Sequence, residues 1–308
     1  MAGKRRRAHR KPSATGVIRP ARRRAAKAGK VVLRQEMTAA VAFAAIARAC
    51  LEHFLRNEAR ILEQHDTEAL HQARVALRRL RSALSIHRAM LSGRRYDGVV
   101  RELRWLAAEL GGARDLDVLL ERAGPGPLAE RLAGARAEAY ASVEATLRSR
   151  RARHLMTDLA EWITAGAWRT DPEHADLRDF PVRAFAAGAL DRFRKRVNKR
   201  GRNLAKLGDE ARHKLRKSAK KLRYGAEFFG GLYPGKPRRK RFLAALEALQ
   251  DELGALNDLR VADELLVRLG LTGDREARRL LCSDGKPELL AAAARRHARL
   301  LDIKPFWR

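Results

Sequence analysis

The sequence predicts an all-α protein built from two related halves, and three observations support this. Alanine, leucine and arginine dominate the 308 residues while β-branched residues are scarce, a composition that favours helices. Apolar residues recur at helical spacing along most of the chain. An eleven-residue basic segment at 71–81 also returns at 213–223, a distance of 142 residues. A repeat of that length in a chain of this size indicates an internal duplication.

The first half is predicted to hold four helices behind a basic arm. Residues 1–35 contain 13 Lys or Arg, no acid and several helix-breaking Pro and Gly residues, which predicts a disordered arm. Helices are expected over 36–63, from Asp66-Thr67 to Ser92-Gly93, over 96–122 and over 128–165. The Gly-Pro-Gly-Pro run at 124–127 separates the last two, because neither residue type continues a helix well.

The second half repeats this order after a linker at 166–181, so the two repeats are 36–165 and 182–308. Its first helix is expected over 182–206 and is rich in Arg and Lys. The next helix begins after Gly208-Asp209 and ends at Tyr233-Pro234-Gly235. Further helices are predicted over 237–269, with a bend at Gly254, and over 274–282 and 286–302.

The repeated segments carry most of their cations along one side of a helix. Because an α-helix turns about 100° per residue, four of the basic positions fall within an arc of about 80°. We call these sets the first stripe (His71, Arg74, Arg78 and Arg81) and the second stripe (His213, Arg216, Lys220 and Arg223). Arg79 lies off the first stripe, while Leu77 and Leu80 face the opposite side, toward a core.

The stripes lack the acidic partners that an ordinary solvated helix face carries. No Asp or Glu occurs from His71 to Arg88, and only Glu227 occurs from His213 to Phe229. Like charges one turn apart repel. A solvated charged face is the alternative, but the same bias in both halves favours binding of an external polyanion.

A second motif follows each basic segment. Its common form is Leu-Gly-x-x-x-Asp-Leu-x-Val, at 110–118 and 253–261. Glycine inside a helix costs about 1 kcal/mol relative to alanine, so Gly111 and Gly254 are expected at close helix approaches. Asp115 and Asp258 either orient stripe arginines or form ordinary interhelical ion pairs. A metal site is disfavoured, because no further ligands surround either aspartate.

Composition narrows the partners further. The net charge is +31 at pH 7, which predicts association with nucleic acid, an anionic membrane or inorganic polyphosphate. Cys50 and Cys282 stand alone, as expected of buried thiols in a reducing cytoplasm. No run of 18 apolar residues exists, so no transmembrane segment is expected, and the basic N-terminus lacks the apolar segment of a secretion signal.

Both motifs together resemble those of the CHAD family, the conserved histidine α-helical domain. The residues that carry the resemblance are 71–81 with 110–118, and 213–224 with 253–258. The resemblance covers the chain from about residue 36 to its end. It implies two four-helix bundles related by pseudo-twofold symmetry, with a basic central channel or groove between them. It also implies binding of inorganic polyphosphate and a cytoplasmic location at polyphosphate granules.

The sequence therefore favours a polyphosphate-binding module that needs no cofactor or metal. Arginine offers bidentate, always-charged contacts to phosphate oxygens and lysine offers point charges. The expected binding residues are both stripes, the adjacent Arg79 and Lys221, and, on weaker grounds, Arg48, Arg56, Arg192, Arg196 and Lys199. The sequence leaves open whether His71 and His213 contact the ligand or are structural.

Two other function classes remain as alternatives. A nucleic-acid-binding protein is the second hypothesis, with residues 1–35 as a non-specific contact, but single-strand binders interleave aromatic residues for base stacking. The first stripe has none and the second offers only Tyr224. An enzyme acting on phosphate is the third, and it is disfavoured because phosphoryl transfer needs a positioned nucleophile or base and usually a metal.

Overall fold

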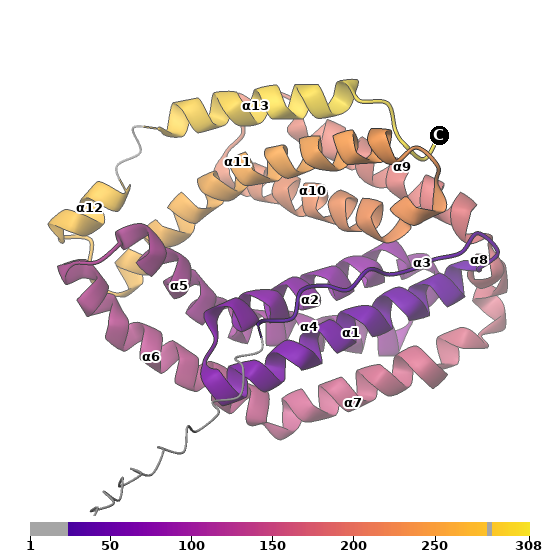
Figure 1. Cartoon of the computed structure of the whole chain (residues 1–308), viewed down its shortest axis with the longest axis horizontal. Helices are drawn as coiled ribbons and strands as arrows, with labels where there is room; N and C mark the ends of the chain where they lie inside the picture. Colours follow the sequence, from indigo (N-terminus) through magenta and orange to yellow (C-terminus); the bar gives the residue numbers. More distant parts are fainter. Residues whose placement is uncertain (1–23, 282–284) are drawn as a thin grey trace, which may run out of the picture.

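The computed structural model describes residues 24–281 and 285–308, and these residues fold as an all-α protein (Figure 1). The described part contains no β-strand, and one isolated bridge joins Thr38 to Pro181. The principal helices of the first half are α1 (Ala39–Gln64), α2 (Thr67–Ile86), α3 (Arg88–Leu91), α4 (Arg94–Glu109), α5 (Gly111–Ala123), α6 (Pro127–Arg148) and α7 (Arg150–Ala165). Those that follow are α8 (Ala175–Asp179), α9 (Val182–Gly201), α10 (Asp209–Phe229), α11 (Lys236–Arg268), α12 (Arg275–Leu281) and α13 (Lys286–Asp302). The predicted fold class is confirmed.

The two basic helices lie at the centre of the molecule. Helix α2 packs against α1, α10 packs against α9, and α2 and α10 contact each other (Figure 1). Asp66 starts α2, because its side chain accepts hydrogen bonds from the backbone N–H groups of Glu68 and Ala69. The sequence repeat thus brings two equivalent helices side by side.

Several predicted helix boundaries are wrong because local caps interrupt the apolar pattern. The helix expected over 96–122 breaks at Leu110 into α4 and α5. The helix expected over 128–165 breaks at Ser149, whose hydroxyl accepts from the N–H of Ala152 and caps α7. Helix α9 ends at Gly201 rather than at residue 206, since Asn203 adopts a left-handed φ of 53°. Helix α11 continues through Gly254.

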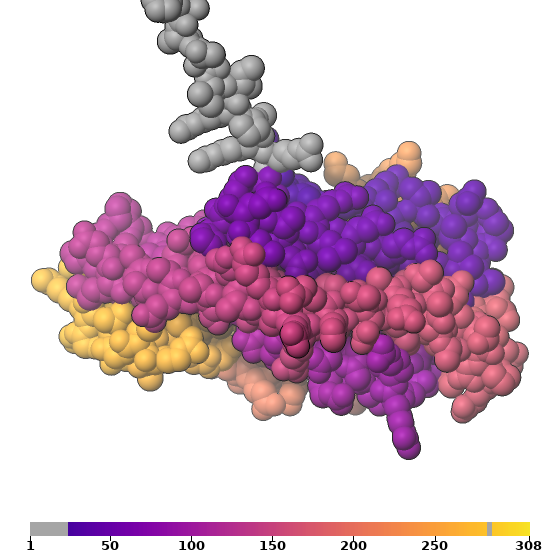
Figure 2. Space-filling model, turned by 90° about the horizontal axis from the view of Figure 1, so that it is seen from below, coloured from indigo at the N-terminus to yellow at the C-terminus, as the bar shows by residue number. Residues whose placement is uncertain are grey.

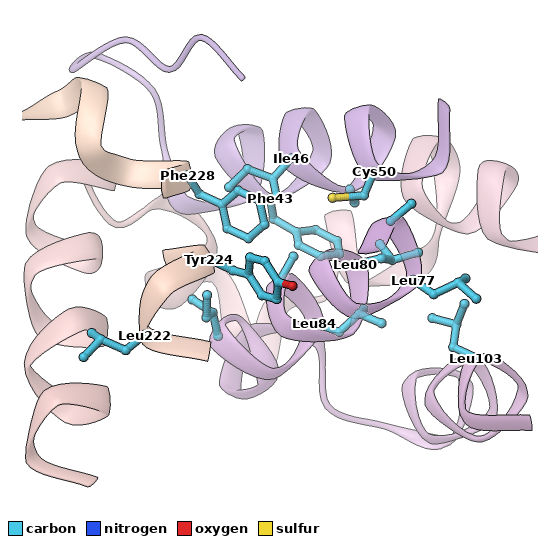
Figure 3. Packing of buried hydrophobic residues seen from close by; sticks show 14 of the residues in the cluster. Phe43, Ile46, Cys50, Leu77, Leu80, Leu84, Leu103, Leu222, Tyr224 and Phe228 are labelled. Atoms are coloured by element: carbon cyan, nitrogen blue, oxygen red, sulfur yellow. The ribbon is translucent and has the colours of Figure 1, made fainter. Parts of the chain in front are cut away.

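One main hydrophobic core spans both halves of the chain. It joins buried residues of α1, α2 and α4 to those of α9, α10 and α11. Figure 3 shows its centre, where Phe43 and Ile46 of α1 lie close to Tyr224 and Phe228 of α10. A smaller cluster at one end joins α5 and α6 to the last turns of α11 and to α12. The two halves therefore do not have separate cores.

Part of the predicted basic arm belongs to the folded unit. Residues 1–23 lie outside the described part, but residues 24–35 run along α1. The carbonyl oxygen of Ala26 lies 2.9 Å from both Asn57 Nδ2 and His53 Nε2, and Leu33 is buried. The prediction of disorder is wrong for this stretch, because these backbone hydrogen bonds hold it on the helix. Cys50 is a buried free thiol, and Cys282 lies outside the described residues.

Helices α6 and α7 extend along one side of the molecule. Figure 2 shows this side, with the magenta and pink segments running along it below the indigo N-terminal helices and the yellow C-terminal segment at the left end. Over 24–281 and 285–308, no helix has the length and apolar character needed to cross a membrane.

Candidate anion-binding site

Four stripe residues gather where α2 passes α10. We call them the central basic cluster: Arg74 and Arg78 of α2, and Arg216 and Lys220 of α10. Burial lowers the pKa values of Arg216 and Lys220, and the charge of Arg78 lowers both further, so the two stripes lie within electrostatic reach of each other. The juxtaposition needs the tertiary fold, since 142 residues separate the two segments.

Burial makes these cations unusually costly to keep charged. Burial, reinforced by Arg216 and Arg78, lowers the pKa of Lys220 from 10.5 to about 6. Burial likewise lowers the pKa of Arg74 to about 10, although Asp115 opposes the change. A bound anion would remove this penalty by supplying negative charge in a poorly solvated place.

The arginines of the stripes also keep unused hydrogen-bond donors. The Nε–H groups of Arg74, Arg78 and Arg216 are buried and have no hydrogen-bond acceptor in the described part of the chain. A buried donor without an acceptor costs about 1–3 kcal/mol. Since phosphate oxygens accept such bonds, these donors point to an anionic ligand rather than to a structural role alone.

The two motif aspartates approach the central basic cluster from α5 and α11. Asp115 Oδ1 lies 4.0 Å from Arg74 Nη2. Burial raises the pKa of Asp115, and the charge of Asp258 raises it further, so the two carboxylates lie near each other. The charge of Asp258 opposes the burial that lowers the pKa values of Arg216 and Lys220. Both aspartates therefore supply partial counter-charge to stripe cations, one of the two roles that the sequence left open.

Of the two close approaches expected at the motif glycines, one is found at Gly111 and none at Gly254. A Cβ atom on Gly111 would lie 3.3 Å from Nη1 of Arg74, a contact that requires the arginine to shift. Nothing lies within 4 Å of the same position on Gly254, so the prediction for that residue is wrong. At Gly111 the neighbour is an arginine side chain of the cluster rather than the backbone of another helix.

Arg79 is positioned away from the central basic cluster, among the core residues between α2 and α10. Its guanidinium donates to the carboxylate of Glu227, and its side chain is only 11% exposed. It also lies 4.8 Å from the ring centroid of Phe228, a cation–π arrangement. Arg79 already has an internal counter-ion and joins the two helices, while its expected role in ligand binding stays a prediction.

The residue of the second half that corresponds to Arg79 makes the equivalent interhelical contact without an acidic partner. Lys221 occupies the position of Arg79 in the second half, and its Nζ donates to Ser85 Oγ at 2.9 Å. Ser85 in turn occupies the position of Glu227. A serine therefore replaces the carboxylate, so Lys221 has no ionic partner at this position.

Further cations surround Lys221. Burial, followed by the charges of Arg196, Arg200, Arg81 and Lys217, lowers its pKa. We call these five residues the lateral basic cluster. Arg196 and Arg81 were expected at the site. Arg200 and Lys217 were missed, although Arg200 lies one helical turn after Arg196 and was detectable from that spacing.

The remaining stripe residues differ in their surroundings. Arg223 Nε lies 3.3 Å from Glu227 and its Nη1 lies 3.6 Å from Glu247, so this residue carries internal acidic partners. His213 Nδ1 lies 3.3 Å from Oδ1 of Asn257, a residue of the second motif. Burial, then Arg114 and Arg78, lowers the pKa of His71. The charge of Arg114 lowers the pKa of His71, and that of Arg260 lowers the pKa of His213 after burial and Lys217. Both arginines lie within the second motif, and the sequence-based prediction did not include them.

The weaker candidates separate into two groups. Arg192 and Lys199 are exposed on α9 together with Arg196, and Arg192 responds to the charge of Arg196. Arg48 and Arg56 are exposed on α1, where Arg56 pairs with Glu52 at 3.6 Å. Helix α1 packs on α2 as α9 packs on α10, so Arg48 and Arg56 lie on the helix equivalent to α9, and their part in ligand binding stays a prediction.

Among the described residues, one group has the composition of a metal site, Asp171, Glu173 and His174 in the linker. Asp171 accepts from the backbone N–H of Glu173, and its other oxygen lies 3.0 Å from His174 Nδ1. The second nitrogen of His174 lies 3.1 Å from Ser92 Oγ. These contacts give the group a local structural role in the turn.

Known proteins match this chain at the level of both sequence and fold. The family model described as the CHAD domain matches residues 45–267. The crystal structure of the CHAD domain from the plant Ricinus communis is 34% identical with a TM-score of 0.72, covering 90% of this chain and 94% of that one. PptA from Streptomyces chartreusis is 19% identical with a TM-score of 0.53, covering 86% and 97%, which is a likeness of fold alone.

Curated relatives match a shorter region. Uncharacterized proteins from two strains of Mycobacterium tuberculosis are each 32% identical over 186 residues, which is 53% of this chain. The match covers 34% of each relative, so this chain corresponds to about a third of the length of the curated relatives it matches.

Proposed function

This chain belongs to the CHAD domain family, and we propose that it binds inorganic polyphosphate through the central and lateral basic clusters. The observation that carries the proposal is the meeting of the two stripes, Arg74 and Arg78 with Arg216 and Lys220. These residues are partly buried, mutually repelling and, in the arginines, left with unused Nε–H donors. A chain of phosphates supplies both the negative charge and the acceptors that this arrangement lacks.

A phosphate polymer fits the spacing of the cations. Each stripe extends about 15 Å along its helix at 1.5 Å per residue, long enough to meet several consecutive phosphates. The surrounding protein reduces screening by water, which strengthens each charge-assisted hydrogen bond. Asp115, at 4.0 Å from Arg74, and the charge of Asp258 partly offset the positive charge of the cluster and compete with the ligand for it.

A ligand without bases fits better than nucleic acid. Tyr224, the one aromatic residue of the second repeated segment near its stripe, is 3% exposed and packs below Arg79 and Arg223. Phe228 and Phe229 are core residues. These rings are therefore unavailable for base stacking, the contact that binders of single-stranded nucleic acid rely on.

The proposal describes a binding module rather than an enzyme. Burial and nearby cations lower the pKa values of both stripe histidines, which keeps them neutral near pH 7. Neutral imidazoles serve as hydrogen-bond partners of phosphate oxygens or of Asn257. We further propose that binding brings the protein to cytoplasmic polyphosphate granules.

The test is a titration of the full chain with polyphosphate at several salt concentrations. We expect the combined variant Arg74→Ala, Arg78→Ala, Arg216→Ala and Lys220→Ala to keep its helical content and to lose at least about 100-fold in affinity, since one charge-assisted bond contributes about 1.5 kcal/mol or more. The slope of log K against log salt should flatten by roughly three, at about 0.7 for each phosphate that the variant no longer neutralises.

The charge-matched control replaces four exposed arginines, Arg88, Arg94, Arg150 and Arg153, by alanine. Its affinity should fall far less. Equal losses in the two variants would show that total charge, not the clusters, determines binding. Competition separates the second hypothesis: if excess polyphosphate fails to displace bound DNA or RNA from the full chain, nucleic acid is the better ligand.

A further inference from the structure

The ends of the two stripes have opposite electrostatic surroundings. Arg223 ends the second stripe, and it pairs with Glu227 at 3.3 Å and with Glu247 at 3.6 Å. Arg81 ends the first stripe and lacks such partners. Burial and then the charge of Arg104 lower the pKa of Arg81, and no carboxylate of the described residues opposes them. One stripe therefore ends against acids and the other against a further cation.

The difference comes from two positions at which the repeats diverge. Ser85 and Glu227 occupy equivalent positions of α2 and α10. Arg104 of α4 corresponds to Glu247 of α11, since each lies six residues before the Leu-Gly pair of the second motif. Helix α4 packs on α2 as α11 packs on α10, and the leucine before each of these two positions is fully buried. Both acids of the second half are thus replaced in the first half.

Four equivalent positions consequently differ in charge between the two sides of the α2–α10 contact. We call them the basic side, Arg81, Ser85, Arg104 and Lys221, and the neutral side, Arg223, Glu227, Glu247 and Arg79. The neutral side holds two cations and two acids that are joined by ion pairs. The basic side holds three cations and a serine, and the serine accepts a hydrogen bond from Lys221.

The basic side also leads outward to further cations. Arg81 belongs to both the first stripe and the lateral basic cluster, so it connects the central basic cluster to that group. Arg196, Arg200 and Lys217 of the lateral basic cluster are exposed, as is Arg104. A polyanion that continues past Arg81 would meet cations from the buried centre to the surface.

An extended polyanion is stabilised by continuing over cations and destabilised by approaching carboxylates. A phosphate beyond Arg223 would have to displace Glu227 and Glu247 from that arginine. We infer that bound polyphosphate leaves the central basic cluster on one side only, past Arg81 and over the lateral basic cluster and Arg104. Glu227 and Glu247 close the pseudo-equivalent side. This inference rests on the proposed function and adds Arg104 to the binding residues.

The test is titration of the full chain with long-chain polyphosphate, using matched charge reversals. Arg104→Glu gives the basic side the acid of the neutral side, and it should weaken binding at least about tenfold, the loss of one charge-assisted contact. Arg153→Glu makes the same change in charge at an exposed residue of α7. Screening by salt should limit its effect to less than about threefold. Equal losses in the two variants would overturn the inference, because total charge would then explain both.

The reverse change tests the neutral side. Glu247→Arg introduces the residue type of the first half at an exposed position, so helical content should be retained. Affinity should rise at least about threefold, and the slope of log K against log salt should steepen by about 0.7 for each further phosphate neutralised. Glu161→Arg, exposed on α7, is the matched control. An affinity of Glu247→Arg no higher than that of this control would contradict the closure of the neutral side.

Failure of this inference is distinguishable from failure of the proposed function. If the unmodified chain does not bind polyphosphate, or if the variant with four alanines in the central basic cluster binds it equally well, the proposed function is wrong. If the four-alanine variant loses affinity while Arg104→Glu and Glu247→Arg behave like their α7 controls, the central basic cluster binds the ligand and only the one-sided path is wrong.

Discussion

Replacing Lys220 by methionine tests whether a neutral buried lysine takes up a proton when the ligand binds. Burial among Arg216, Arg78 and Arg223 lowers the pKa of Lys220 from 10.5 to about 6, so its amine is mostly neutral near pH 7.5. A phosphate placed next to it would favour the charged form and raise that pKa. Binding at pH 7.5 should therefore take up close to one proton at this site, and affinity should fall as pH rises above about 6.

The same shift has a consequence for stability. The folded pKa lies below the unfolded value of 10.5, so between about pH 6 and pH 10.5 the unfolded chain holds the extra proton. In this window Lys220 destabilises the folded state less and less as pH rises. Below about pH 6 this destabilisation is constant and at its largest. The cost of the charged form is on the order of 6 kcal/mol at 1.36 kcal/mol per pH unit. Lys220→Met should raise the unfolding midpoint, more at pH 6 than at pH 9.

The assay is calorimetric titration with long-chain polyphosphate in two buffers of different ionisation enthalpy. For the unmodified protein the observed heats should differ between the buffers, in proportion to the protons taken up. In Lys220→Met the difference should disappear and the affinity should fall about tenfold. Lys214→Met is the matched control, because Lys214 is exposed on the same helix and pairs with Glu210. Equal heats in both buffers for the unmodified protein would refute the reasoning.

Three further predictions concern the contacts of Glu227, Gly111 and Gly254. Glu227→Gln leaves the nearly buried Arg79 without its counter-ion, so the free energy of unfolding in denaturant titrations should fall by about 1–3 kcal/mol. Ser85→Ala, at the equivalent position of the other half, should lower the free energy of unfolding by less than about 1 kcal/mol. Equal losses in the two variants would contradict the difference between the two contacts. Gly111→Ala should displace Arg74 and weaken polyphosphate binding several-fold in titrations, because the new Cβ meets Nη1 at 3.3 Å. The Cβ of Gly254→Ala meets no neighbour within 4 Å inside α11, so this variant should stabilise the fold by about 0.5–1 kcal/mol in thermal melts. A loss of polyphosphate binding in this variant would show that the glycine has a role outside packing.

The helical pattern and the stripes were readable from sequence because both depend on local periodicity. Leu77 and Leu80 are buried as their spacing predicts, and the opposite side of α2 holds the cations. The helix break at Ser149 was not readable, since arginines flank it and one hydroxyl-to-backbone hydrogen bond decides the boundary. The break at Leu110 was readable in principle, because Gly111 and Gly112 follow it directly. Similarly, nothing in the sequence of residues 24–35 showed that Asn57 and His53 would hold Ala26 on α1.

The sequence by itself determined the fold class, the duplication and the central basic residues, because helix faces follow from spacing and repeats from identity. Only the tertiary structure decided which of those cations act together. It joined Arg78 to Arg216 and Lys220, gave Arg79 an internal partner in Glu227 and left Lys221 with Ser85 alone. Charge is a property of each residue, whereas burial and the distance between charges depend on how distant helices pack, and those two quantities determine where an anion is needed.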